Sequence, residues 1–253
     1  MVSSFYTSLF IELCCGETSE LCKLEHTTTT CLGVRITARH DITSERTLDM
    51  LNHCVTALGF GKYVVVWMSF RCSGGSQLQQ LNEWKAKATG KRLTIDKIEA
   101  SRKEFRDHFH GAAPFVRLVR GLGGHLALEL PRGCQYWGQP LLTHFVESYA
   151  LHTANFDGCM YGLVAKYGES AGDSMLKHWR LVTTSSVVAG TVNKRCSHVA
   201  PHVRIEGRNT KCSENYPSEL AKEVHRAFRD ELGAPGVRVV AFTSSSTSRS
   251  ALQ

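Results

Sequence analysis

The 253-residue chain has no apolar run near the length of about 20 residues that a membrane helix needs. Its apolar opening lacks a basic start and is interrupted by Glu12, which argues against a signal peptide. Its ten cysteines lack the dense spacing of a disulfide-stapled secreted domain. We therefore expect reduced thiols, no membrane partner, and an intracellular location in the nucleus or cytoplasm.

Two strong signatures are also missing. The first strand-to-helix turn contains only Gly16, so it lacks the G-x-G-x-x-G spacing of a dinucleotide fingerprint. Cys196, His198 and His202, with Cys212, offer four zinc ligands, but their C-x-H-x3-H spacing is not a strong zinc signature. Structural zinc therefore stays one hypothesis for these residues.

The run "YVVVWMSFRCSGGSQLQQLN" is what the rest of the chain is organised around. Val64 to Trp67 form a β-branched and aromatic block, typical of a buried parallel strand. A polar loop with Cys72, Gly74 and Gly75 follows, and the glycines predict a sharp, mobile turn. Ligands bind at this end of strands in open α/β sheets, so Cys72 is either a nucleophile or an ordinary loop thiol.

The order of elements predicts an α/β fold with a mostly parallel sheet. A strand leads to a short helix capped by Thr18 or Ser19, and a second strand leads to a helix capped by Ser44. The expected strands are 8–13, 32–37, 64–67, 125–130, a hairpin formed by 156–168 and 177–186, and 237–242. The expected helices are 20–23, one from 45 to 58, 94–111, 115–120, 140–151 and one starting at Pro217 with Leu220, Val224 and Phe228 buried.

Basic and acidic side chains stand out in two places. Residues 73–93 predict an exposed, mobile loop or a short helix, and the net charge of +7 allows a polyanionic partner. Glu129 lies inside the apolar run "LALELP", where a carboxylate needs a partner, so it is either bonded to a neighbouring turn or a site acid. The basic residues that could contact phosphates, or simply form a solvated face, are Lys85, Lys87, Lys91 and Arg92.

The ordered motifs resemble those of the cytosine-5 DNA methyltransferases over roughly residues 8 to 230. "FIELCCGETSEL" is similar to the motif that binds S-adenosylmethionine, and "WMSFRCSGGSQLQQLN" to the catalytic P-P-C-Q loop. "LALELPRG" resembles the E-N-V motif, "KHWRLVTTS" the arginine-bearing strand, and "ENYPSELAKEVHRAF" the closing helix. The chain is also similar to methyltransferase-like segments of retroelement polyproteins.

The resemblance implies a Rossmann-like methyltransferase fold with a C-terminal antiparallel hairpin. It implies that Cys72 attacks a flipped cytosine, in DNA or RNA, while Glu129 and Arg180 bind the base. Arg71 is expected to lower the pKa of the Cys72 thiol. The residues implied to hold S-adenosylmethionine are Glu12, Cys15, Gly16, Asp41 and Ile42.

Departures from the family leave two other hypotheses open. Phe70 and Arg71 replace the two prolines of the catalytic loop, and the first motif lacks its glycine pair. These hypotheses are a catalytically inactive module for nucleic-acid binding or assembly, and a zinc-stabilised interaction domain. Residues 1–242 are expected to form one domain, with a reduced Cys/His-containing insert at 190–216 and a disordered Ser/Thr-rich tail at 243–253.

Overall fold

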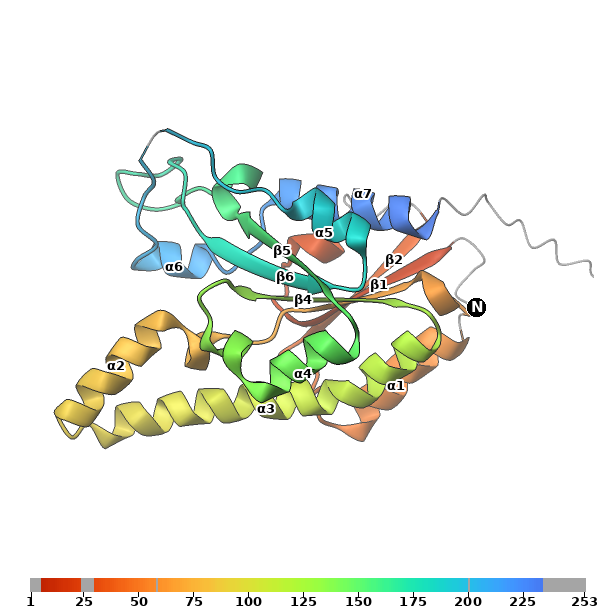
Figure 1. Cartoon of the computed structure of the whole chain (residues 1–253), viewed down its shortest axis with the longest axis horizontal. Helices are drawn as coiled ribbons and strands as arrows, with labels where there is room; N and C mark the ends of the chain where they lie inside the picture. Colours follow the sequence, from red (N-terminus) through yellow and green to blue (C-terminus); the bar gives the residue numbers. More distant parts are fainter. Residues whose placement is uncertain (1–5, 24–29, 58, 200, 234–253) are drawn as a thin grey trace, which may run out of the picture.

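The computed structural model describes residues 6–23, 30–57, 59–199 and 201–233. A six-stranded sheet in the order β2-β1-β3-β4-β6-β5 forms its centre, and helices cover both faces (Figure 1). The strands are β1 (Ser8–Cys15), β2 (Cys31–Thr37), β3 (Val64–Met68), β4 (His125–Pro131), β5 (His152–Asp157) and β6 (His178–Thr183). The α-helices are α1 (Glu45–Ala57), α2 (Gln77–Ala88), α3 (Arg92–Gly121), α4 (Pro140–Ser148), α5 (Ser186–Val192), α6 (Arg208–Cys212) and α7 (Ser218–Leu232).

The sheet is mostly parallel. Strands β2, β1, β3 and β4 run parallel to one another, whereas β6 lies antiparallel between β4 and β5. The predicted α/β class and the mostly parallel sheet with an antiparallel pair are therefore confirmed. The connection from β2 to β3 carries α1, and the connection from β3 to β4 carries α2 and α3, as βαβ units require.

The alternation of side chains along each strand sorts the core into two layers. In β1, Leu9, Ile11 and Leu13 face the layer of α1, α3 and α4, which is drawn below the sheet in Figure 1. Phe10 and Trp67 face the opposite layer, formed by α5 and α7. Helices thus cover both faces of the sheet, as is usual for parallel strands.

Helix α3 is longer than the sequence pattern predicts. We expected separate helices at 94–111 and 115–120, but one helix of 30 residues runs through Pro114. Phe105, Phe109 and Val116 continue a single buried stripe across the proline. This packing outweighs the cost of about 3 kcal/mol that proline imposes on a helix interior.

Several local expectations can be compared with the structure directly. Ser44 caps α1, because its hydroxyl accepts the Thr47 N–H at 3.3 Å, and α7 buries its predicted stripe. The predicted helix at 20–23 is only a 3₁₀ turn, Glu20–Cys22, and the Ser19 hydroxyl caps nothing there. The strand predicted at 156–168 is wrong, since β5 ends at Asp157 and a 3₁₀ turn, Gly158–Tyr161, follows.

Residues 73–93 are helical rather than a loop. They comprise the 3₁₀ turn Ser73–Gly75, helix α2 and the start of α3, so the helical alternative is the one found. The predictions for 237–242 and 243–253 lie outside the described residues. Among the helices that the structure describes, none combines the length and apolarity needed to cross a membrane.

Candidate functional site

Cys72 and Glu129 come from neighbouring parallel strands. Cys72 follows β3 and begins the 3₁₀ turn Ser73–Gly75, and Glu129 lies near the carboxyl end of β4. The charge of Glu129 influences the Cys72 thiol, which places the two groups in one electrostatic environment. The two residues therefore lie at the same edge of the sheet, with Cys72 packed against the layer of α3 and α4 and Glu129 bonded to Tyr216 in the opposite layer.

The two glycines after Cys72 serve close packing. A Cβ atom on Gly74 would lie 2.7 Å from the Tyr136 hydroxyl and 2.9 Å from the Arg102 amide nitrogen. A Cβ atom on Gly75 would lie 2.8 Å from the Cys134 sulfur. The backbone beside Cys72 is thus held against α3 and the segment after β4, so the glycines have a different role from the sharp, mobile turn that we expected.

Glu129 belongs to a buried hydrogen-bond network. The Tyr216 hydroxyl donates to Glu129 Oε2 at 2.6 Å, and the Trp67 indole N–H donates to the Tyr216 oxygen at 3.2 Å. Ser69 Oγ lies 3.1 Å from the same hydroxyl. Glu129 Oε1 is also buried, and among the described residues it has no hydrogen-bond partner.

Burial sets the proton affinity of this network. It raises the pKa of Glu129 to about 7, against which the Tyr216 hydrogen bond and the Lys177 charge act. Burial, followed by the charge of Glu129, raises the pKa of Cys72 to about 11, while Lys177 lowers it. The Cys72 thiol is therefore neutral near neutral pH, whereas Glu129 is divided between its protonated and ionised forms.

The expected effect of Arg71 on the thiol is wrong. Its guanidinium forms a half-exposed ion pair with Glu104 of α3 at 3.4 Å. The cation that acts on Cys72 is Lys177, whose ammonium also donates to the Ser213 carbonyl at 2.5 Å. Lys177 immediately precedes β6, the strand in which the resemblance implied a functional role for Arg180.

Arg180 lies on the other face of the sheet. Its register partner in β4 is Leu130, whereas Glu129 is paired with Leu181, and successive residues of a strand face opposite ways. The guanidinium of Arg180 stands 5.3 Å from the centre of the Trp137 ring. The prediction that Arg180 and Glu129 bind one base together is therefore wrong.

The predicted cofactor residues divide into buried and exposed groups. Glu12, Cys15 and Ile42 are buried, and only Gly16 and Asp41 reach the surface. Glu12 Oε1 accepts the Ser19 hydroxyl at 2.8 Å, and burial raises the pKa of Glu12 to about 7. Ile42 is part of the core and cannot touch a ligand in this arrangement.

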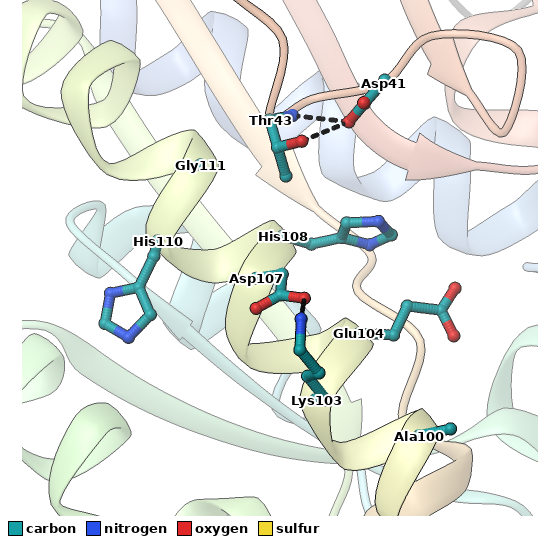
Figure 2. A pocket seen from close by; sticks show the side chains of 9 residues that line it. All are labelled: Asp41, Thr43, Ala100, Lys103, Glu104, Asp107, His108, His110 and Gly111. Carbon is teal, nitrogen blue, oxygen red and sulfur yellow. Dashed lines mark hydrogen bonds and ion pairs between the residues drawn. The ribbon is translucent and has the colours of Figure 1, made fainter. Parts of the chain in front are cut away.

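An open cavity of about 550 Å³ lies beside Asp41. Figure 2 shows Asp41 and Thr43 on one side and α3 on the other, with His108 and Glu104 projecting from the helix. The Asp41 carboxylate is fixed by the Thr43 N–H at 2.9 Å and hydroxyl at 2.6 Å. Burial of Asp41 is slight, and these hydrogen bonds lower its pKa.

The cavity is connected to the end of β1 by Cys14. The Cys14 sulfur lies 3.9 Å from His108 Nδ1, and its backbone adopts a φ of 59°, a left-handed conformation that non-glycine residues rarely take. The strand order reverses between β1 and β3, and ligands bind at such a switch point in open α/β sheets. Cys14 is therefore a strained residue at the expected ligand edge.

The basic residues predicted to meet nucleic acid lie on the arm formed by α2 and the start of α3, at the far left in Figure 1. Lys85, Lys91 and Arg92 are exposed, and Lys87 pairs with Glu83 at 2.6 Å. The same arm exposes large apolar side chains: Leu78, Leu81, Trp84 and Leu93. The arm thus combines positive charge with an exposed aromatic ring.

The predicted metal ligands are only partly brought together. Cys196, His198 and His202 cluster, but the fourth member is Cys159 of the turn after β5. Cys212 lies at the end of α6 and is not in that group, so its prediction as a ligand is wrong. Spacing along the chain could not reveal Cys159, which is 37 residues away from Cys196 in the sequence.

Sequence reasoning also missed three groups at the other sites. Tyr216 lies in the segment "ENYPSELAKEVHRAF", whose resemblance to the closing helix gives the tyrosine no role. No sequence motif marks Lys177 or His108 as a functional residue. Comparison with protein-family models, curated proteins and solved structures found no match to the chain. The class is therefore defined by the structure itself: an α/β protein with a cavity and a buried acid at the carboxyl edge of its parallel strands.

Proposed function

We propose that this protein is an S-adenosylmethionine-dependent nucleic-acid methyltransferase that acts on carbon five of cytosine. The observation that carries the proposal is the buried Glu129, which the Tyr216 hydroxyl holds by one oxygen, at the same edge of the sheet as the Cys72 thiol. A carboxylic acid kept neutral by burial can donate a proton to a bound base. A cysteine at the adjacent strand end supplies the nucleophile that this chemistry needs.

The cavity beside Asp41 supports a cofactor site. Its volume of about 550 Å³ lies within the usual range for small-molecule sites, and it adjoins the ends of β1 and β2. Asp41 lines this cavity, and Gly16 is exposed after the end of β1, whereas Glu12 would act by holding the β1 turn through Ser19. When bound, S-adenosylmethionine supplies an electrophilic methyl group.

The chain's own residues carry the steps on the base. The Cys72 thiolate bonds to ring carbon six, the electron pair of the carbon five–carbon six double bond moves to carbon five, and Glu129 gives its proton to ring nitrogen three. Once carbon five carries the methyl group, it loses its proton to a base, the Cys72 thiolate is expelled, and ring nitrogen three returns its proton to Glu129, which restores the ring and the acid. In this scheme Lys177 replaces Arg180 as the cation on the face of Glu129.

The electrostatics link the acid to the thiol. The negative charge of Glu129 raises the pKa of Cys72. When Glu129 is protonated this effect disappears, and the charge of Lys177, which lowers the pKa of Cys72, remains. Protonation of Glu129 and ionisation of Cys72 thus favour each other. Nucleic acid would approach from the arm of α2 and α3, where Lys91 and Arg92 attract phosphates and Trp84 offers a ring for base stacking.

The first test is calorimetry with S-adenosylmethionine on the purified protein, followed by incubation with DNA containing 5-fluorocytosine. We expect saturable cofactor binding and a covalent adduct that survives denaturing electrophoresis. Cys72→Ser should abolish the adduct and retain cofactor binding, while Cys54→Ser on α1 should change neither. An adduct missing from wild-type protein at saturating cofactor would refute the catalytic claim.

A second candidate is a catalytically inactive nucleic-acid-binding module of the same fold. The raised pKa of Cys72 and the position of Arg180 on the opposite face favour it. It predicts salt-sensitive binding to DNA or RNA that Cys72→Ser leaves unchanged, without an adduct. Binding without cofactor affinity would support this candidate over the enzyme.

A further inference from the structure

We propose that Cys159, Cys196, His198 and His202 form a structural zinc site. These residues carry two sulfur and two nitrogen ligands, and their ligand atoms all lie within 4.8 Å of one another. Two thiolates with two imidazoles in tetrahedral array are a set that zinc prefers. The site shares no residue with Cys72 and Glu129, so the zinc proposal does not depend on the proposed activity.

The distances within the cluster fit a single tetrahedral ion. With zinc–sulfur bonds of about 2.3 Å and zinc–nitrogen bonds of about 2.0 Å, a tetrahedron separates sulfur from nitrogen by about 3.5 Å and two nitrogens by about 3.3 Å. Cys196 Sγ lies 3.4 Å from His202 Nε2, and His198 Nδ1 lies 3.5 Å from the same nitrogen. The Cys159 side chain interacts with that of Cys196 and completes the set.

The cluster joins two distant segments. Cys159 is buried in the 3₁₀ turn that follows β5, and the other three ligands come from the segment between α5 and α6. A bridge between Met175 and Val203 holds this segment just after His202. A zinc ion would tie the segment to the turn after β5 with bonds far stronger than the contacts available to an exposed loop.

Surrounding groups hold Cys196 in position. The buried Asp157 accepts the Cys196 N–H at 2.8 Å and the Arg195 guanidinium N–H at 3.0 Å, both on Oδ2. The N–H of His198 donates to the Cys196 sulfur at 3.4 Å, which fixes the position of the sulfur. Such outer contacts orient metal ligands and are a regular part of built zinc sites.

Metal analysis of the full chain tests the proposal. Protein purified with zinc present should contain about one zinc ion per chain, and cobalt replacement should give the visible absorption of a tetrahedral ion with a thiolate charge-transfer band. Cys196→Ser and His202→Ala should each lose the zinc. Cys212→Ser removes a nearby cysteine outside the cluster and should keep it.

Chelation provides a measurement that does not depend on a folded variant. Removing zinc from the wild-type chain should lower its melting temperature, and adding zinc back should restore it. Substoichiometric zinc in wild-type protein after this reconstitution would overturn the proposal. So would equal loss of zinc in Cys212→Ser, or a Cys159–Cys196 disulfide found by mass spectrometry in protein kept under reducing conditions.

Discussion

Replacing Glu129 with glutamine should make the protein's stability much less dependent on pH. The substitution keeps the size of the side chain and an oxygen that can accept the Tyr216 hydroxyl, but it removes the ionisable group. In the wild-type protein, Glu129 has its pKa raised from 4.5 to about 7 by burial. The folded chain therefore holds a proton that the unfolded chain has lost at any pH between these values.

The sign and size follow from proton linkage. The stability contributed by the protonated acid is fully present below about pH 4.5 and is lost as the pH rises through about 7. A rise in pKa from 4.5 to about 7 corresponds to on the order of 3 kcal/mol in the free energy of unfolding. Glu12 has a similarly raised pKa, so both acids should lower the free energy of unfolding of the wild-type protein as the pH rises over this range.

Urea unfolding between pH 5 and 8 measures the effect. The free-energy difference between Glu129→Gln and wild type should shift in favour of the variant as the pH rises, by on the order of 3 kcal/mol. Glu147→Gln, at an exposed position of α4, is the matched control and should show a constant difference. Wild-type stability that increases from pH 5 to 8, or parallel curves for wild type and Glu129→Gln, would refute the reasoning.

Other substitutions probe the core, the thiol and the arm. Phe105→Ala removes a fully buried ring and should cost about 3–5 kcal/mol in urea unfolding. Lys177→Gln should raise the pKa of Cys72 further, seen as slower alkylation at a given pH, and an unchanged rate would contradict the assignment of Lys177. The double substitution Lys91→Ala and Arg92→Ala should make the plot of log binding constant against log salt concentration less steep, by the equivalent of roughly two phosphate contacts. An unchanged slope would show that nucleic acid binds elsewhere.

The fold was largely predictable because its strands are marked by composition. Val64 to Trp67 are β-branched or aromatic and end at glycine-containing loops, so their positions follow from local rules. Helix α3 was harder, because the cost of Pro114 is local while the packing that overcomes it comes from the sheet. Ser19 was read as a cap, but the buried Glu12 competes for its hydroxyl.

The site was only partly predictable, since a motif gives positions but not facing directions. Cys72 and Glu129 could be placed at one edge of the sheet from the sequence, because parallel strands end at the same edge. The prediction for Arg180 was wrong because the strand register pairs Arg180 with Leu130. A sequence does not reveal the register between distant strands. Cys159 was missed for a related reason, because tertiary contact supplies a ligand that spacing cannot.

The position of β6 has a consequence for how the chain folds during synthesis. Strands β1 to β4 can pair as soon as residue 131 has emerged, but β5, which among the described strands pairs with β6 alone, joins the sheet when β6 follows. Tyr216 arrives later still, 87 residues after Glu129. Contacts this distant in sequence form slowly. The nascent protein therefore completes its parallel half first, and the acid at its centre remains open to water until the last helix docks.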